Sequence, residues 1–552
     1  MEREPRFRVL SAVAFLILCM GWLGRYARVI EREQSPNPLV HSASFYLRSC
    51  SNQPIEWREW GAEVFEEAQR SGKPVYAELG ASWSAGAAWA NEDVYHDEGI
   101  ANLLNTQAIP VKVDFDSSPK VARHLLNQAE VLGVRRGIPV GLTLDPEGIA
   151  IFAIAVDSRT NLGRALDQFF RLYKNQPQAT RQRAEQMKMA LTRIPDAGPV
   201  SEELLDRLSS DIMNSLSQAT PGAARPLTTL RFAVARAGGD IRSVRLMALQ
   251  LLWDQRKSAR WDDRGFGFFV DQGAGKGQLP FRAKRAIDNA LYLDVYCDLY
   301  DLTKDPAIAK TALDIVEFLR RDLWGERPAG FRNAALFQPS ILTGSASGQR
   351  DSRISQIDTT LKADAQGAAI VALCRFARVM PVSEQTEWVR DAAERTFRTL
   401  QSLLSANQFI YHTAHRQTQD WVADDVWAVL AALELSALIG DPEIRAWGIR
   451  LLDKAIERCC APGSNGAFYD VSHLRQYGSV VVTPLAWGTD EGLPSDNAVV
   501  ADVLIAAARM TGEKKYRDCA ENLIAAFAGS MAEAPLTTAS LAASLQRLME
   551  LP

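Results

Sequence analysis

The sequence predicts a multidomain protein in which a small α/β domain is followed by an all-α domain, with a membrane-spanning helix at the N-terminus. Three observations carry this prediction: an apolar run near the N-terminus, alternating strand and helix patterns up to about residue 174, and repeated helical hairpins after about residue 200. The chain has 552 residues, which exceeds what one core supports, so we expect two or three domains.

The N-terminal prediction rests on residues 9–24, an uncharged and mostly apolar run with arginines on both sides. At ~1.5 Å per residue the run is short for a ~30 Å hydrocarbon core, but flanking arginines reach the interface by snorkelling. No small-x-small cleavage site follows, which favours an uncleaved anchor over a cleaved signal peptide. We therefore expect a single-pass membrane protein, with the membrane as one partner and the soluble body in the periplasm or another extracytoplasmic space.

The α/β domain follows a polar linker. Strands are predicted at residues 74–79, 109–115, 140–144 and 149–156, and helices at residues 85–107, 119–131 and 161–174. The sequence DPEG at residues 145–148 is a turn signal between the last two strands. The order strand–helix–strand–helix–strand–strand–helix is the thioredoxin order.

The all-α part contains three similar joints. They are LYDLTKDPAIAKTALDIVEFL from Leu299, LSALIGDPEIRAWGIRLLDKAI from Leu435 and AARMTGEKKYRDCAENLIAAFA from Ala507. Each joint is a helix end, a tight turn and a new amphipathic helix, which is the pattern of an αα-hairpin. Hairpins of this kind bury their apolar faces only against neighbours, so about 350 residues of them predict a closed ring of roughly six.

These patterns divide the chain into four parts. We predict an anchor and linker at residues 1–34, the thioredoxin-like domain at 35–178, a linker at 179–200 and the helical ring at 201–552.

Several short motifs connect the chain with a known family. They include SFYLRSCSNQPIEW from Ser44, VKVD from Val111, RGFGFF from Arg264 and DEGLPSDN from Asp490. With these motifs the chain resembles the spermatogenesis-associated protein 20 type of protein. The resemblance implies a thioredoxin-like domain fused to an (α/α)6 toroid of the six-hairpin glycosidase-like kind.

The active-site motif of that family is degenerate in this chain. Where the family has C-H-W-C-H, residues 84–88 read SAGAA. Disulfide exchange needs a thiolate and a second, resolving thiol, so the hydroxyl of Ser84 and the methyl group of Ala87 predict a redox-inactive site. The resemblance places Pro139 at the cis-proline position of thioredoxins. It leaves Cys50 as a residual thiol that could lie near the old site, and we favour a structural role for it.

The polar residues retained in the ring form the candidate site. The catalytic candidates are Asp424, Asp490 and Asp288, and the ligand-binding candidates are Trp421, Trp487, Lys284, Asn289, Ser495 and Asn497. Glycoside cleavage needs two carboxyl groups about 5–10 Å apart. For each carboxylate, helix capping or a solvated loop is the alternative. We expect His412 and His415 to lie in a solvated loop or at a helix end, and we predict no metal site.

The function predicted from these features is binding or scaffolding of a protein or glycan partner. The alternative is a carbohydrate-active enzyme, glycosidase- or epimerase-like, with a role in carbohydrate metabolism. A net charge of −4 without a basic patch argues against nucleic acid as the main partner. The sequence has no phosphate-loop, nucleophile-elbow or metalloprotease motif, and we expect no cofactor.

Overall fold

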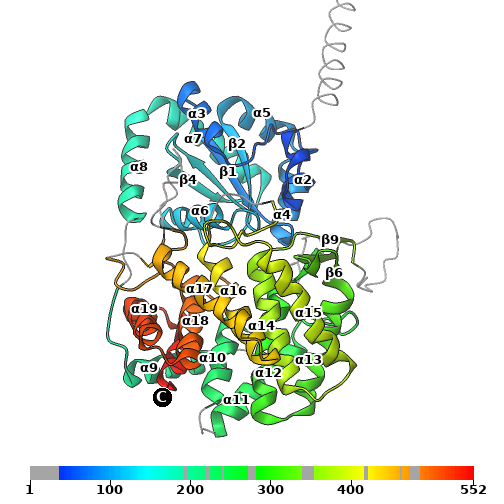
Figure 1. The fold of residues 1–552 in the computed structure, drawn as a ribbon. Coiled ribbons are helices and arrows are strands. Elements are labelled where there is room, and N and C mark those ends of the chain that lie inside the picture. Colours follow the sequence, from blue (N-terminus) through cyan, green and yellow to red (C-terminus); the bar gives the residue numbers. More distant parts are fainter. Residues whose placement is uncertain are drawn as a thin grey trace, which may run out of the picture.

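The computed structural model describes residues 37–191, 196–218, 224–238, 242–270, 281–337, 354–415, 420–460, 463–472 and 485–551. Figure 1 shows the α/β domain, coloured blue to cyan, resting against one end of a ring of helices coloured green to red. The two parts touch over a broad contact, and the candidate site lies in that contact.

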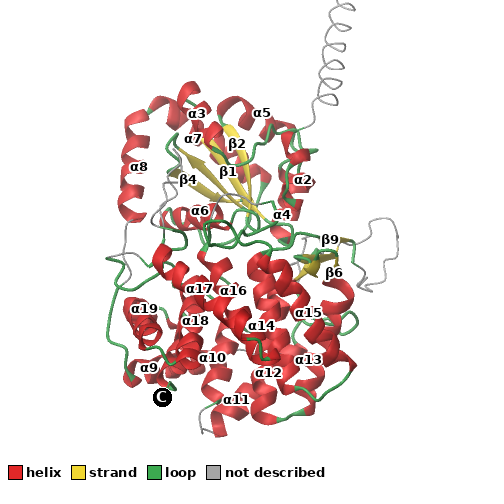
Figure 2. Cartoon of the chain, viewed as in Figure 1, coloured by secondary structure: helices red, strands yellow, loops and turns green. Residues whose placement is uncertain are grey.

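The α/β domain is built on one four-stranded sheet (Figure 2). Its strands are β1 (Val75–Gly80), β2 (Ile109–Asp114), β3 (Val140–Leu144) and β4 (Ala150–Ala155), in the order β2-β1-β3-β4. β1 is parallel to β2, and β3 is antiparallel to both of its neighbours. Every residue of β1, β2 and β3 is buried, because helices cover both faces of the sheet.

The covering helices form two layers. One layer contains α2 (Phe45–Ser49), α4 (Ala85–Trp89), α5 (Glu98–Gln107) and α7 (Arg159–Asn175), and the other contains α3 (Ala62–Ser71) and α6 (Pro119–Val131). A further helix, α8 (Pro177–Leu191), packs against β4 and α6. The predicted boundary at residue 178 falls in the first turn of this helix.

The predicted helix over residues 85–107 is interrupted in the structure. It divides into α4, a π-helical turn over Ala90–Val94, and α5. Asp97 begins α5 by accepting a hydrogen bond from the main-chain nitrogen of Ile100 at 3.0 Å. An N-cap of this kind starts a new helix, and it lies inside a segment whose apolar pattern had indicated one continuous helix.

The all-α part is a closed ring of helical hairpins. The inner helices, each in contact with the next and the last with the first, are α10 (Leu227–Ala237), α12 (Ala286–Thr303), α14 (Ala363–Val379), α16 (Val422–Ile439), α18 (Asp496–Thr511) and α20 (Ala539–Met549). The outer helices are α9 (Glu202–Gln218), α11 (Arg242–Lys257), α13 (Pro306–Phe318), α15 (Glu384–Gln401), α17 (Pro442–Cys459) and α19 (Lys514–Glu533). This arrangement is the (α/α)6 toroid expected from the sequence.

The hairpin joints begin where the sequence predicted them. Asp305 caps α13 and Asp441 caps α17, and each is followed by a proline at the first helical position. The aspartate accepts a main-chain hydrogen bond, and the proline has no N–H to satisfy there. A small antiparallel sheet, β5 (Arg282–Arg285), β8 (Ala334–Phe337) and β9 (Gln356–Asp358), lies at the end of the ring that faces the α/β domain.

The prediction of a membrane-spanning helix is corrected by the structure. Among the residues that the structure describes, no helix has both the length and the apolar character needed to cross a bilayer. The apolar run at residues 9–24 and the anchor predicted at residues 1–34 lie outside the described residues. The predicted single-pass anchor, the membrane location and the extracytoplasmic body are therefore not supported.

Candidate ligand-binding site between the two domains

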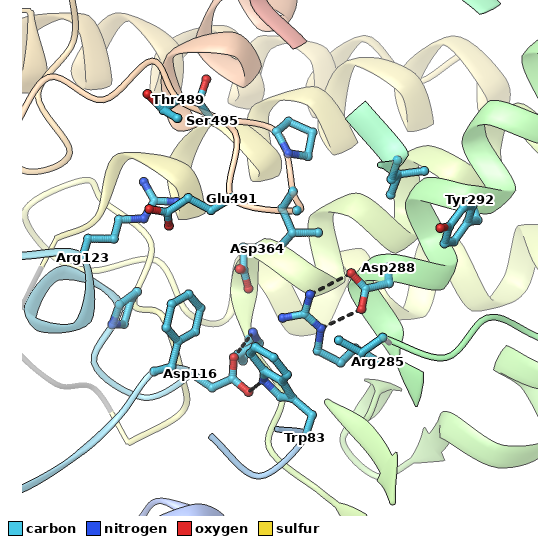
Figure 3. Close-up of a pocket in the computed structure, with 18 of the residues that line it drawn as sticks. Trp83, Asp116, Arg123, Arg285, Asp288, Tyr292, Asp364, Thr489, Glu491 and Ser495 are labelled. Carbon is cyan, nitrogen blue, oxygen red and sulfur yellow. Dashed lines mark hydrogen bonds and ion pairs between the residues drawn. The ribbon is translucent and has the colours of Figure 1, made fainter. Parts of the chain in front are cut away.

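A cavity of about 180 Å³ lies where the α/β domain meets the ring (Figure 3). Its wall includes Trp83, Phe115, Asp116 and Arg123 from the α/β domain and Arg260, Arg285, Asp288, Tyr292, Lys362, Asp364, His412, Trp421, Glu491 and Ser495 from the ring. Pockets for drug-sized ligands usually measure ~300–1,000 Å³, so this cavity suits one small molecule.

Carboxylates from four consecutive inner helices gather at this end of the ring. Asp288, Asp364, Asp424 and Asp496 lie in the first turns of α12, α14, α16 and α18, and all four are buried. The positive end of each helix dipole stabilises a carboxylate at that position. The fold therefore provides an acidic mouth that faces the α/β domain.

His412 joins this acidic mouth to the α/β domain. Its Nδ1 atom lies 2.9 Å from Oδ1 of Asp424, and its Nε2 atom lies 2.7 Å from the main-chain oxygen of Asp116. A carbonyl oxygen only accepts hydrogen bonds, so Nε2 carries a proton. Burial alone would lower the pKa of His412, but the Asp424 carboxylate opposes this and raises the pKa to about 9. We infer an imidazolium at neutral pH.

Asp364 has a carboxylate that is buried but lacks an ionic partner. Its Oδ1 atom accepts a hydrogen bond from the main-chain nitrogen of Ala365 at 2.7 Å, and within the described part of the chain it forms no ion pair. Figure 3 shows this carboxylate directed into the cavity. A nitrogen of His412 lies within 4.8 Å of this carboxylate, but no cation among the described residues forms a direct ion pair with it, which makes Asp364 the acidic wall group most available to a ligand.

The same three side chains could hold a metal ion. One ligand atom each from Asp364, His412 and Asp424 lie within 4.8 Å of one another. Carboxylate oxygen and imidazole nitrogen are ligands that divalent metals accept. Nδ1 of His412 and Oδ1 of Asp424 are already joined by a hydrogen bond. A metal ion could therefore bind both atoms only by displacing the proton between them.

Asp116 joins the α/β domain to the ring at this cavity. Its carboxylate accepts hydrogen bonds from Nζ of Lys362 at 2.9 Å and from Nδ2 of Asn333 at 2.7 Å, in addition to Nε1 of Trp83 at 2.9 Å. Burial alone would raise its pKa, but Lys362 and Arg285 hold the pKa of Asp116 below its ordinary value. The ionised carboxylate therefore helps to hold the domains together.

Arg285 fills one side of the cavity. Its guanidinium forms two hydrogen bonds with the Asp288 carboxylate, at 2.7 and 2.8 Å, which are drawn in Figure 3. The same guanidinium lies 4.2 Å from the ring centroid of Trp83. Asp288 therefore lines the cavity, as expected of a catalytic candidate, but Arg285 already neutralises its charge.

The segment that the resemblance aligns with the family's redox motif is part of the domain contact. Ser84 caps α4 by accepting a hydrogen bond from the main-chain nitrogen of Ala87 at 3.2 Å, and its hydroxyl donates to the oxygen of Ile138 at 3.3 Å. The peptide bond between Ile138 and Pro139 is cis, as the resemblance implied. Ala87 is fully buried.

The residues around Ser84 pack against the ring. Trp83, Ala85 and Ala88 lie against an apolar cluster of the small sheet that includes Phe281 and Leu336. Small side chains at residues 85 and 88 permit this close packing. The face that carries the active site in a redox-active thioredoxin is therefore covered here by the protein's own second domain.

Cys50 does not line the cavity between the domains. It is buried in the core of the α/β domain, and its Sγ atom donates to the main-chain oxygen of Tyr46 at 3.4 Å. Burial raises the pKa of the Cys50 thiol to about 11. All cysteines in the described residues are free: Cys50, Cys297, Cys374, Cys459, Cys460 and Cys519.

Two of the ligand-binding candidates, Asn289 and Asn497, are structural clamps. Oδ1 of Asn289 accepts from the main-chain nitrogen of Phe268 at 2.7 Å, and its Nδ2 atom donates to the oxygen of Phe268 at 3.0 Å. The same two-bond clamp joins Asn497 to Phe468 and Gln366 to Phe331. Each clamp holds a neighbouring segment of the chain against the first turn of an inner helix. The side-chain amides thus find their hydrogen-bond partners within the protein, without a ligand.

The other predicted residues divide between the cavity and its surroundings. Trp421 and Ser495 line the cavity. Asp490 accepts hydrogen bonds from the main-chain nitrogens of Ser495 and Ser540, which ties the starts of α18 and α20 together. Trp487 packs under Arg136 at 4.0 Å and is outside the cavity wall.

Lys284 is a structural residue too. It is buried, and its Nζ atom lies 2.7 Å from Oδ2 of Asp262 and 2.5 Å from the main-chain oxygen of Phe266. Burial lowers the pKa of Lys284 to about 8. The contacts with Asp262 and Phe266 hold the loop before α12 in place.

Several residues of the cavity wall were not predicted as site residues, among them Asp116, Arg123, Arg260, Lys362, Asp364 and His412. The structure buries His412, although the sequence indicated a solvated loop, and leaves His415 exposed. One sequence pattern could have indicated the acidic residues at the mouth of the ring. An aspartate followed by asparagine or aspartate recurs at residues 288–289, 424–425 and 496–497, each time at the start of an inner helix.

Comparisons with known proteins agree with this architecture. Residues 36–193 match the family model Thioredox_DsbH, described as "Protein of unknown function, DUF255". The spermatogenesis-associated protein 20 of Rattus norvegicus is 24% identical over 326 residues, which is 55% of this chain and 41% of that protein. The chain thus spans about two-fifths of the length of this relative. The resemblance inferred from the sequence motifs is confirmed.

Solved structures of low similarity cover a little more than half of the chain. A sugar epimerase from a ruminal bacterium is 13% identical with a TM-score of 0.41, covering 55% of this chain and 76% of the epimerase. A glycoside hydrolase family 76 mannosidase from Bacteroides thetaiotaomicron is 12% identical with a TM-score of 0.45, covering 63% of this chain and 99% of the mannosidase. At these values the likeness concerns the fold alone.

Proposed function

We propose that this chain, a relative of the spermatogenesis-associated protein 20 proteins, binds one small hydroxyl-rich ligand, such as a single sugar unit, in the cavity between its domains. In this proposal the thioredoxin-like domain forms one wall of the binding site and has no redox role. The observation that carries the proposal is the Asp364 carboxylate, which is buried, directed into the cavity and without an ion pair among the described residues.

The chemistry of the cavity wall fits a sugar. A carboxylate accepts hydrogen bonds from vicinal hydroxyl groups, and Trp83, Trp421 and Tyr292 add aromatic side chains to the cavity wall. Sites for small polar ligands combine such apolar walls with a few convergent polar groups. The volume of about 180 Å³ favours one ring over a chain of rings.

Of the two partner classes predicted from the sequence, this geometry favours the glycan over a protein. The α4 face that would receive a peptide in a redox-active thioredoxin is packed on the ring through Trp83, Ala85 and Ala88. Loss of the thiols at residues 84 and 87 removes the covalent step that such a peptide would need.

A binding experiment tests the proposal. We would titrate the purified protein with a panel of monosaccharides and follow heat by calorimetry and the melting temperature. Asp364→Asn should weaken binding about 10- to 100-fold, because hydrogen bonds to a charged group contribute ~1.5–3 kcal/mol. Asp518→Asn, which changes an exposed carboxylate in the outer helix α19, is the matched control. Absence of binding by every sugar, or an unchanged affinity in Asp364→Asn, would refute the proposal.

A second candidate function is a carbohydrate-active enzyme. It is favoured by the spacing of Asp364, His412 and Asp424, whose ligand atoms lie within 4.8 Å of one another. An imidazole beside carboxyl groups can provide an acid and a base in one cavity. Incubation of disaccharides and reducing monosaccharides in D₂O, followed by NMR, would detect both glycoside cleavage and exchange at a carbon next to the carbonyl. Sugar binding without either reaction would leave only the binding function.

A further inference from the structure

The charges around the cavity are almost completely paired. The wall residues and their partners form five ion pairs: Asp116–Lys362, Arg123–Asp496, Arg285–Asp288, Glu491–Arg136 and His412–Asp424. Two charged wall residues, Asp364 and Arg260, form no direct ion pair with another described residue. The cavity thus presents one unpaired carboxylate and one unpaired guanidinium.

Arg260 is held at the cavity although no carboxylate neutralises it. It follows α11 and is half-buried, and its main-chain oxygen accepts a hydrogen bond from the nitrogen of Phe269 at 2.7 Å. Its guanidinium lies beside the hydroxyl of Tyr292, and its Nε atom is buried without a hydrogen-bond partner in the described residues. A buried donor left unsatisfied costs free energy, which a ligand acceptor would recover.

We propose that the ligand of this cavity is an acidic sugar, with its carboxylate bound by Arg260 and its hydroxyl groups bound by Asp364. This inference rests on the proposed function, because it names the class of sugar for the same site. A hexuronic acid unit carries one carboxylate and several hydroxyl groups on a single ring. It therefore complements one guanidinium and one carboxylate within a small cavity.

A neutral sugar would satisfy only half of this site. Hydroxyl groups can bind Asp364, but they leave Arg260 with neutral acceptors, whereas a carboxylate pairs with a guanidinium in a bidentate, charge-assisted geometry. A simple anion such as inorganic phosphate would satisfy Arg260 and leave Asp364 facing like charge. The combination of the two groups selects a ligand that is both anionic and rich in hydroxyl groups.

The test compares matched sugars on the full-length protein. We would measure the affinities of D-glucuronate and D-galacturonate against those of D-glucose and D-galactose by calorimetry at fixed ionic strength. We expect at least one uronate to bind about tenfold or more tightly than its parent hexose. Arg260→Gln should reduce that preference to within about threefold, while Arg264→Gln, which removes an exposed charge four residues away, should preserve it.

The outcomes separate this inference from the proposed function. If hexoses bind as well as uronates, or if Arg260→Gln keeps the preference, the acidic-sugar assignment is wrong and the sugar-binding function stands. If neither class binds, both are wrong. If inorganic phosphate competes with equal affinity and Asp364→Asn does not weaken uronate binding, the site is a simple anion site and the assignment fails.

Discussion

The Nε2 atom of His412 lies 2.7 Å from the main-chain oxygen of Asp116, so one imidazole from the ring holds a loop of the thioredoxin-like domain. The other nitrogen of the same imidazole is bonded to Asp424, at the start of an inner helix. His412 therefore connects the acidic mouth of the ring to the domain that covers it. The stability of this arrangement depends on the proton that His412 retains.

We predict that His412→Ala destabilises the protein in a pH-dependent way. The pKa of His412 is raised to about 9 in the folded state, above the ordinary value of about 6.5. The stabilisation is thus fully present below pH ~6.5 and is lost as the pH rises towards 9. Unfolding measured at several pH values should show the largest difference between the wild type and His412→Ala at the low end of this range.

His415→Ala provides the control for that series, because His415 is exposed and only three residues away. Its melting temperature should follow that of the wild type at every pH. A difference between wild type and His412→Ala that grows as the pH rises from 6.5 to 9 would contradict the proton assignment.

We predict that the wild-type protein has no thiol–disulfide activity and that restoring both cysteines does not confer normal activity on protein substrates. Ser84→Cys combined with Ala87→Cys puts thiols at the first and fourth positions of the motif, with the first at the N-terminus of α4. The pair should form a disulfide that small thiols reduce. Insulin reduction should stay low, because Trp83, Ala85 and Ala88 are packed on the ring. Rapid insulin turnover by the double variant would show that this face is accessible.

We predict that Asn289→Leu lowers the stability of the ring by about 2–4 kcal/mol, because the N–H and C=O groups of Phe268 lose buried hydrogen-bond partners. Chemical denaturation followed by circular dichroism would measure this loss. Asn214→Leu, on the exposed face of α9, is the control. If Asn289→Leu unfolded like the wild type but bound sugars poorly, Asn289 would be a ligand residue and the clamp would be secondary.

The sequence predicted the elements of this fold better than it predicted the site. Residues 119–131 form α6 as expected, because a proline at the start and a helical apolar period both mark it. The interrupted helix over residues 85–107 was missed because a single N-cap, Asp97, decides it. The cavity was not predictable, since Asp116 and Lys362 are 246 residues apart and nothing local indicates that they meet.

The retained candidates show the same limit. Neither Asp424 nor Asp490 lines the cavity, although each is hydrogen-bonded to a residue that does, His412 and Ser495 respectively. From a single sequence, a polar residue that caps or clamps the fold cannot be distinguished from one that binds a ligand. Only the tertiary contacts of Asn289 and Asn497 distinguish a clamp from a ligand contact.

The thioredoxin-like domain contains a buried ion pair that the sequence did not indicate. Nζ of Lys112 lies 3.0 Å from Oε2 of Glu78, and both side chains are fully buried between the neighbouring strands β1 and β2. The Lys112 ammonium also lies 4.4 Å from the ring centroid of Tyr95 and 4.5 Å from that of Trp57. Burial raises the pKa of Glu78, and Lys112 opposes that rise.

Removing the lysine should therefore leave a carboxyl group that has to be neutral when the protein is folded. Lys112→Met should cost about 3–5 kcal/mol near neutral pH, the usual loss when one partner of a buried pair is removed. A carboxyl group whose folded pKa lies above its unfolded value takes up a proton on folding, so the variant's stability falls as the pH rises above ~4.5. The cost at pH 5 should then be smaller than at pH 7. Adding Glu78→Leu to Lys112→Met should recover much of the lost stability, because no buried charge remains. An equal loss at pH 5 and pH 7 in Lys112→Met would contradict this prediction and would show that Lys112 contributes packing around Tyr95 and Trp57.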